Sequence, residues 1–343
     1  FKQKTAYEIG VRLVGSEMCI RDSCYPDARP LLKGLRLYHD RFRLEEEIRS
    51  GGFATVWRAT ESGHDAPLAL KIGRITDDPG FDRTIIKEAE IIQRLQHPGI
   101  VRLFLLPRQD RTPVAYARAI EMPGQPFFFA MEYLAGGTLA DFLKETKRVS
   151  VAEAAALGLG IGRALDHMHM LGYAHNDLKL ENIVFRYPVA AGQAYSPTLI
   201  DFGIATRVKL QATAGSFYIM SPEQLVQAKM LAAPEVAEAV DHTKVDVWGM
   251  GILLYRMLGG CLPFDGRDER SVTSRILKSR PQSLLELSKD IPPELDSVII
   301  DGCLAKNPAY RLSLVELGQY LRRYGEGVVA SRAANAGRRR RLW

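Results

Sequence analysis

A change of hydrophobic periodicity at Gly136 and Gly137 constrains the fold of this chain most. Before this pair, residues 42–73 form short runs of apolar and β-branched residues joined by Gly, Ser and Asp turns, a pattern typical of strands. After it, residues 151–171 follow a helical period. The apolar stripe of this segment consists of Leu157, Ile161, Leu165 and Met168. The pattern predicts an α+β fold with a small sheet-rich lobe and a larger, mainly helical lobe.

One helix interrupts the predicted sheet. Residues 81–96 have a helical period. Its apolar face consists of Ile85, Ala89, Ile92 and Leu95. Strand-like runs follow around 100–106 and 127–133, and we expect the polar, Pro-containing segment 107–126 between them to be a loop. The predicted small lobe spans 42–130.

The remaining boundaries follow from composition. A linker at 131–137 leads into the larger lobe at 138–322. Residues 24–41 are an unassigned leader. Residues 323–343 are rich in Gly, Ala and Arg, so we expect a disordered tail. Its Arg338–Arg341 run is typical of a solvated tail, with a nuclear-import signal as the alternative.

The first 23 residues resemble a translated sequencing adaptor rather than a protein segment. KQKTAYE and LVGSEMCIRDS match the translated ends of a widely used library adaptor, and residues 9–12 leave room for a sample index. These residues also lack the layout of a signal peptide. We therefore expect residues 1–23 to be an artefact that hides the natural N-terminus, with a genuine disordered leader as the alternative.

Charge and cysteine content exclude several classes of protein. The tail at 322–343 holds seven Arg and one Glu, a charge of +6 that equals the net charge of the whole chain, while residues 1–23 sum to +1 and residues 24–321 sum to −1. By composition, the body is therefore not a nucleic-acid-binding surface. The four cysteines form no CxxC pair, and no apolar run reaches the length of a membrane span. We expect a cytoplasmic protein with no membrane partner, and a nuclear one if the Arg run acts as a signal.

The glycine pair in SGGFATV, at 50–56, has two interpretations. It could be an ordinary hairpin turn, or a loop whose backbone N–H groups approach the phosphates of a nucleotide. The pattern is degenerate, because Arg49 and Ala54 stand where glycines are usual. The candidate nucleotide-binding residues of this segment are Ile48, Gly51, Gly52, Phe53, Ala54 and Val56.

Lys71 lies in the apolar run LALKIG, so we expect it to be half-buried and to need an anionic partner. Glu88 on the following helix can supply that partner. Glu90 is the competing carboxylate, but it lies on a different face of the helix. A Lys–Glu pair can position a polyphosphate through its ammonium group.

The segment HNDLKLEN, at 175–182, carries the candidate chemistry. Asp177 could accept a proton from an alcohol, and Lys179 could neutralise charge on a phosphoryl group. Asn182 offers a neutral oxygen to a metal ion. Asp201 ends the apolar run LIDFG and offers a carboxylate to Mg²⁺, which prefers oxygen ligands.

These segments occur in an order that resembles the eukaryotic protein kinase superfamily over 42–322. The matching elements are the loop at 48–56, Lys71, Glu88, MEYLAGG (131–137), HNDLKLEN (175–182), DFG (201–203), SPE (221–223), DVWGMG (246–251) and Arg311 in NPAYRLS. The resemblance implies a bilobal kinase fold with ATP between the lobes, and Mg²⁺ ions held by Asn182 and Asp201. It also implies an ion pair of Glu223 with Arg311, and anchoring of the catalytic loop by Asp246.

The resemblance further implies which residues surround the adenine and what the acceptor is. Ala69 and Met131, the latter at the gatekeeper position, would line the adenine site, and Glu132 and Leu134 would offer backbone groups. Lys179 and the Gly215–Ser216 pair before SPE resemble the Ser/Thr class, which implies Ser or Thr acceptors. The SPE and DVWGMG elements, which kinases of small alcohols generally lack, imply a protein substrate. The alternative function is a pseudokinase, a nucleotide-binding or scaffold module without phosphoryl transfer.

Asn176 departs from the pattern of the family. Most members carry an Arg immediately before the catalytic Asp, and that Arg pairs with a phosphate on the activation loop. Asn cannot supply a cation. The departure predicts a non-RD kinase whose activity does not depend on phosphorylation of Thr206, Thr213 or Ser216 in the usual way.

Overall fold

A computed structural model of the chain describes residues 32–75, 79–108, 111–190, 193–203, 205–207, 218–230 and 240–325. These residues form two compact units. The first contains residues 32–90 and 103–133, and the second contains 91–102 and the described residues from 134 onward. The adaptor-like segment at 1–23 and the Arg run at 338–341 lie outside the described residues.

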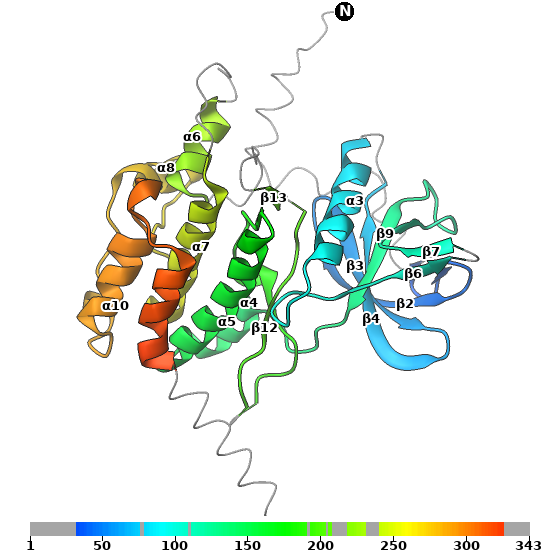
Figure 1. Cartoon of the computed structure of the whole chain (residues 1–343), viewed down its shortest axis with the longest axis horizontal. Helices are drawn as coiled ribbons and strands as arrows, with labels where there is room; N and C mark the ends of the chain where they lie inside the picture. The colour runs from blue at the N-terminus through cyan, green and yellow to red at the C-terminus, as the bar shows by residue number, and fades with distance from the viewer. Residues whose placement is uncertain are drawn as a thin grey trace, which may run out of the picture. The chain divides into compact units, whose positions relative to one another are not determined.

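The first unit is built on an antiparallel sheet with the strand order β1-β2-β3-β4-β9-β5, and β8 also pairs with β9. Figure 1 labels β2, β3, β4 and β9 of this sheet. Its elements are β1 (Arg36–Leu37), β2 (Phe42–Ser50), β3 (Ala54–Glu61), β4 (His64–Gly73), α3 (Pro79–Arg94), β5 (Leu103–Phe104), β6 (Leu106–Arg108), β7 (Arg111–Val114), β8 (Ala117–Arg118) and β9 (Phe127–Glu132). Helix α3 begins in this unit and ends in the second.

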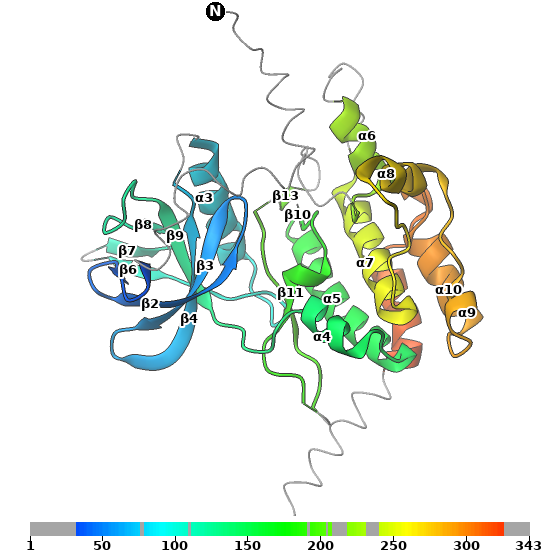
Figure 2. The ribbon, with the colours of Figure 1, turned by 180° about the vertical axis from the view of Figure 1, so that it is seen from behind.

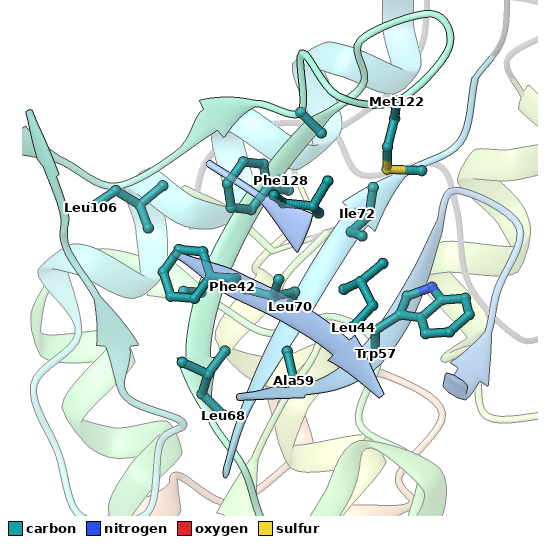
Figure 3. Packing of buried hydrophobic residues seen from close by; sticks show 13 residues of the cluster. Phe42, Leu44, Trp57, Ala59, Leu68, Leu70, Ile72, Leu106, Met122 and Phe128 are labelled. Atoms are coloured by element: carbon teal, nitrogen blue, oxygen red, sulfur yellow. The ribbon is translucent and has the colours of Figure 1, made fainter. Parts of the chain in front are cut away.

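Side chains of the central strands alternate between the two faces of the sheet. On β4, Leu68, Leu70 and Ile72 point into one apolar cluster, while Ala69 and Lys71 point to the opposite face. Figure 3 shows this cluster closely packed. The labelled members are Phe42, Leu44, Trp57, Ala59, Leu68, Leu70, Ile72, Leu106, Met122 and Phe128. Lys71 therefore lies on the face of the sheet opposite to the apolar cluster.

Two segments of this unit are more ordered than the sequence pattern indicated. Residues ahead of Phe42 contribute β1, which pairs with β2, and the fully buried Leu37. The segment 107–126, expected to be a loop, contains β7 and β8, and β7 forms a hairpin with β6. Ala119 and Met122 of this segment join the apolar cluster. Their burial stabilises the strands of the segment, which its polar composition alone does not predict.

A Leu37→Ala variant tests whether the segment ahead of Phe42 belongs to the folded unit. Leu37 is 0% exposed, and removing a buried leucine side chain costs about 2–5 kcal/mol in transfer and cavity energy. We expect a matching loss in the free energy of unfolding, measured by urea denaturation followed by tryptophan fluorescence, to which Trp57 of the same cluster contributes. A change below about 0.5 kcal/mol, the usual effect of a surface substitution, would show that the segment is not part of the core.

The second unit is mainly helical, as the periodicity predicted (Figure 2). Its elements are α4 (Leu139–Thr146), α5 (Val151–Met170), β10 (Tyr173–Ala174), η1 (Leu180–Asn182), β11 (Ile183–Phe185), β12 (Pro197–Leu199), β13 (Thr206–Arg207), α6 (Pro222–Met230), α7 (His242–Gly259), α8 (Glu269–Lys278), α9 (Leu284–Leu287), α10 (Pro293–Ser297), η3 (Val298–Cys303) and η4 (Pro308–Tyr310). Residues 314–325 are also helical.

The core of the second unit lies between α5 and α7, which run side by side in both views (Figures 1 and 2). Ser150 and Glu153 form a capping box at the start of α5, and the predicted stripe of this helix is buried. Gly158 permits close packing, because a Cβ there would lie 2.9 Å from Leu321 and 3.1 Å from Leu254. No helix in the described ranges is both long and apolar enough to cross a bilayer.

Candidate active site

The glycine pair of the first unit lies in the turn between β2 and β3. The Gly51 N–H donates to the Ala54 carbonyl oxygen at 2.9 Å, and a Cβ added at Gly52 would meet nothing within 4 Å. Arg49 is part of β2 and pairs with Val56, after a register shift between Glu47 and Arg49. Two apolar side chains of this turn region, Ile48 and Phe53, are about half exposed, at 47% and 46%. Both apolar side chains therefore contact solvent close to the glycine pair.

Lys71 and Glu88 form the expected ion pair. The Lys71 Nζ atom on β4 lies 2.7 Å from both Oε1 and Oε2 of Glu88 on α3. Their side chains are only 11% and 2% exposed, so the charges compensate each other in a poorly hydrated place. Glu90, the competing carboxylate, is exposed. The pair fixes an ammonium group above one face of the sheet.

Strand register brings several of the predicted nucleotide-binding residues to that same face. Val56 is the cross-strand partner of Lys71, and Ala69 is the partner of Met131. Residues two apart on one strand share a face, and direct cross-strand partners share it too. Val56, Ala69, Lys71 and Met131 therefore lie on one face of the sheet, which places the Lys71 ammonium group beside three apolar side chains.

The catalytic-loop residues of the second unit converge on Asp177. The Lys179 Nζ atom lies 2.9 Å from Asp177 Oδ2, and Asn182 Nδ2 donates to the same oxygen at 3.0 Å. Asn182 Nδ2 also donates to the Asp177 backbone carbonyl. Asp177 Oδ1 is buried and has no hydrogen-bond partner among the described residues. The carboxylate is thus held through one oxygen while its other oxygen can accept a proton.

Asp246 of α7 holds the backbone of this loop, as expected. Its carboxylate is fully buried and accepts the N–H groups of His175 and Asn176, both at 2.8 Å, and the Nε2–H of His169 at 2.8 Å. Burial alone would raise the pKa of Asp246, but the hydrogen bond and charge of His169, together with His175, hold this pKa below its ordinary value. The lowered pKa favours the ionised carboxylate, which accepts these hydrogen bonds from the loop.

Asn182 and Asp201 lie at matching ends of two paired strands. Ile183 on β11 pairs with Leu199 on β12, and the Ile200 N–H donates to the Asn182 carbonyl at 3.0 Å. Asp201 has a φ of +66°, a left-handed conformation that Asp tolerates better than most residues. The following Phe202 is fully buried, with its ring 5.3 Å from that of His175. The pair of strands thus delivers an amide and a carboxylate to one place.

These two residues fit a hard divalent cation. Carboxylate and amide oxygens are the donor types that Mg²⁺ prefers. The amide nitrogen of Asn182 donates to Asp177, which orients its oxygen away from that carboxylate. Within the described residues, no group of three His, Cys, Asp or Glu side chains could hold a metal. Both candidate donors are oxygens, which suit Mg²⁺ better than the nitrogen and sulfur donors typical of zinc sites.

Glu223 and Arg311 form the second expected ion pair. Arg311 Nη1 and Nη2 donate to the two Glu223 carboxylate oxygens at 2.6 and 2.7 Å, a bidentate geometry. The Arg311 guanidinium also lies 5.0 Å from the ring of Trp248 on α7. The pair links the start of α6 to the segment after η4 and supports the helical unit that carries the loop.

Two of the predicted nucleotide-binding residues belong to different units, and two residues that contact the catalytic loop were not predicted from the sequence. Glu132 ends β9 in the first unit, while Leu134 belongs to the second. Gln224 and His242 both contact the loop at Asn176, yet no sequence pattern singled them out. The only available signal for Gln224 was its position directly after the SPE motif.

Comparison with known proteins agrees with this arrangement. The chain is 30% identical over 308 residues to the serine/threonine-protein kinase PkaA of Streptomyces coelicolor, covering 86% of this chain and 52% of that protein. It is 29% identical over 274 residues to PknA of Mycobacterium tuberculosis, covering 79% and 58%. It is 26% identical over 284 residues to PrkC of Bacillus subtilis, covering 80% and 39%. The chain thus spans about half the length of these relatives.

The family model for the protein kinase domain matches residues 42–321, which include both ion pairs, the glycine-containing turn and the catalytic loop. This range covers most of the chain and agrees with the α+β architecture of a curled antiparallel sheet and a helical unit. The chain therefore belongs to the protein kinase domain family.

Proposed function

We propose that this protein transfers the γ-phosphoryl group of ATP to Ser or Thr hydroxyls of protein substrates, with residues 42–322 as the kinase domain. The observation that carries the proposal is the Asp177 carboxylate, which is oriented by Lys179 and Asn182 and keeps one buried oxygen that no described residue contacts by a hydrogen bond. A scaffold module would not need a carboxylate held in this way. Names of the relatives support the Ser/Thr class.

Each unit would contribute distinct roles. In the first, the turn at Gly51 and Gly52 and the Lys71 ammonium would bind the phosphates of ATP, and Ala69 and Met131 would contact the adenine. The adenine edge would hydrogen-bond to backbone groups at Glu132 and Leu134. Binding of the nucleotide would thus use backbone donors, one cation and an apolar surface.

The second unit would carry the chemistry. Asp177 would accept the proton of the substrate hydroxyl while the hydroxyl oxygen forms a bond to the γ-phosphorus of ATP. The bond between that phosphorus and the bridging oxygen breaks, and ADP leaves. Lys179 would stabilise negative charge on the transferring group. Asn182 and Asp201 would hold Mg²⁺, which when bound supplies charge neutralisation on the phosphate oxygens.

The test is transfer of label from γ-labelled ATP to a generic protein substrate, followed by identification of the labelled amino acid. We expect phosphoserine or phosphothreonine. Binding of a fluorescent ATP analogue without transfer would instead support the pseudokinase alternative, toward which Arg49 and Ala54 in the glycine-containing turn point. Label found only on tyrosine would contradict the Ser/Thr assignment.

We also propose that the enzyme is of the non-RD type, active without a phosphate on its activation segment. Asn176 is neutral and buried, so it cannot pair with a phosphate as an Arg would. Thr213 and Ser216 lie outside the described residues. We expect phosphatase treatment to leave at least half of the activity. Abolition of activity by phosphatase, with recovery when the segment is phosphorylated again, would contradict this prediction.

Two proposals concern the ends of the sequence. We propose that residues 1–23 are a translated sequencing adaptor; resequencing the locus from an independent library tests this, and finding the same codons in the genome would refute it. Cytoplasmic location is proposed for the body of the protein, and nuclear import is the hypothesis for Arg338–Arg341. An unchanged location after deletion of that run would remove the import hypothesis.

A further inference from the structure

Asn176, the residue that departs from the family pattern, is held at each of its polar groups. It is 4% exposed and has a φ of +66°, a left-handed conformation that Asn tolerates better than most non-glycine residues. Its backbone N–H donates to Asp246 Oδ1 at 2.8 Å, and its backbone carbonyl accepts from Gln224 Nε2 at 3.3 Å. Both partners lie on helices, α7 and α6.

The side chain of Asn176 is held as well. Its Nδ2 donates to the Ala174 carbonyl at 3.3 Å, and its Oδ1 accepts from Nδ1 of His242 at 2.7 Å. His242 is the first residue of α7 and is 0% exposed. Because the amide oxygen can only accept, this contact requires the His242 ring to carry its proton on Nδ1. The bond between His242 and Asn176 is the shortest of the four, and burial shields it from competing water.

We infer that His242 and Asn176 form an internal anchor that positions the catalytic loop for phosphoryl transfer without a bound phosphate. This inference rests on the proposed kinase activity and gives the non-RD type a structural basis. The anchor holds Asn176, the residue directly before Asp177. It therefore restricts rotation of the backbone next to Asp177 and keeps the carboxylate of Asp177 in place. His242 is a positioning residue, because it touches Asn176 and acts through it.

The helices make this anchor rigid. Asp246 is four residues after His242 on α7, one turn along the same helix, and holds the backbone of His175 and Asn176. Two points of attachment on one helix and a third from Gln224 on α6 define the orientation of the loop. A misplacement of about 1 Å in a reacting group can cost about a hundredfold in rate, so losing one attachment has a measurable effect.

The experiment uses the phosphatase-treated full chain and two substitutions of the same residue. In His242→Phe a ring remains but the donor is lost, and in His242→Asn a side-chain amide donor replaces Nδ1–H. For His242→Phe we expect kcat to fall by about 10–100-fold while the KM for ATP changes less than about threefold. For His242→Asn we expect kcat within about threefold of the unsubstituted enzyme. All rates are measured at a temperature well below the thermal unfolding midpoint of each variant.

The outcomes separate this inference from the proposed function. An unsubstituted enzyme that transfers no phosphate refutes the proposed function and the inference together. An active enzyme whose kcat is unchanged in His242→Phe, or is equally low in both variants, refutes the anchor alone. If His242→Phe does not fold, Asn176→Gly removes the same hydrogen bond and tolerates the positive φ, and an unchanged kcat in this variant also refutes the anchor.

Discussion

An Asp177→Asn variant is expected to lose phosphoryl transfer by about 10²–10⁴-fold, the usual contribution of a general base. The substitution keeps the size and shape of the side chain and removes the basic oxygen. The contacts of Lys179 and Asn182 with Asp177 Oδ2 show that the loop already orders this group, so the main change is chemical. We expect the loss in kcat, with the KM for ATP within about threefold, in steady-state assays with labelled ATP.

Asp166→Asn is the matched control, because it makes the same chemical change on α5, outside the catalytic loop. We expect its kcat to stay within about twofold of the unsubstituted enzyme. If Asp177→Asn retains more than a tenth of the activity, the assigned role of Asp177 is wrong. Binding of a fluorescent ATP analogue by both variants would show that any loss arises after the nucleotide has bound.

The main features of the fold could be predicted because they depend on local periodicity. The buried stripe of α5 and the face of α3 follow from apolar residues three and four positions apart. Lys71 could be assigned a buried partner from its apolar neighbours alone, since an uncompensated buried charge is costly. By contrast, burial of Leu37 depends on packing against strands that follow it in the chain, and no local pattern reports such a contact.

The support of the catalytic loop could be predicted only in part. Asp177, Lys179 and Asn182 lie within six residues of one another, so their spacing in the sequence carries a signal. Asn176 and His242 are 66 residues apart, and a lone His at a helix start is an ordinary feature. The sequence showed that an Arg is missing at position 176. Only the structure shows which groups contact the Asn that replaces it.

An Arg311→Met variant is expected to lower the free energy of unfolding by about 3–5 kcal/mol. The Arg311 side chain is 0% exposed and donates to both oxygens of Glu223, so its removal leaves a largely buried carboxylate without its cation. The guanidinium also donates to the carbonyls of Ala305 and Lys244, which lose these hydrogen bonds. Urea denaturation followed by far-ultraviolet circular dichroism, dominated by helices, measures the loss.

Two further variants decide whether the charge or the packing is responsible. Glu223→Met combined with Arg311→Met removes both charges, so we expect it to regain part of the stability lost in the single variant. The exposed pair of Arg280 and Asp301, 67% and 47% exposed, is the surface control, and Arg280→Met is expected to cost less than about 1 kcal/mol. A double variant no more stable than Arg311→Met would show that the backbone hydrogen bonds of Arg311, rather than its pairing with Glu223, account for its contribution.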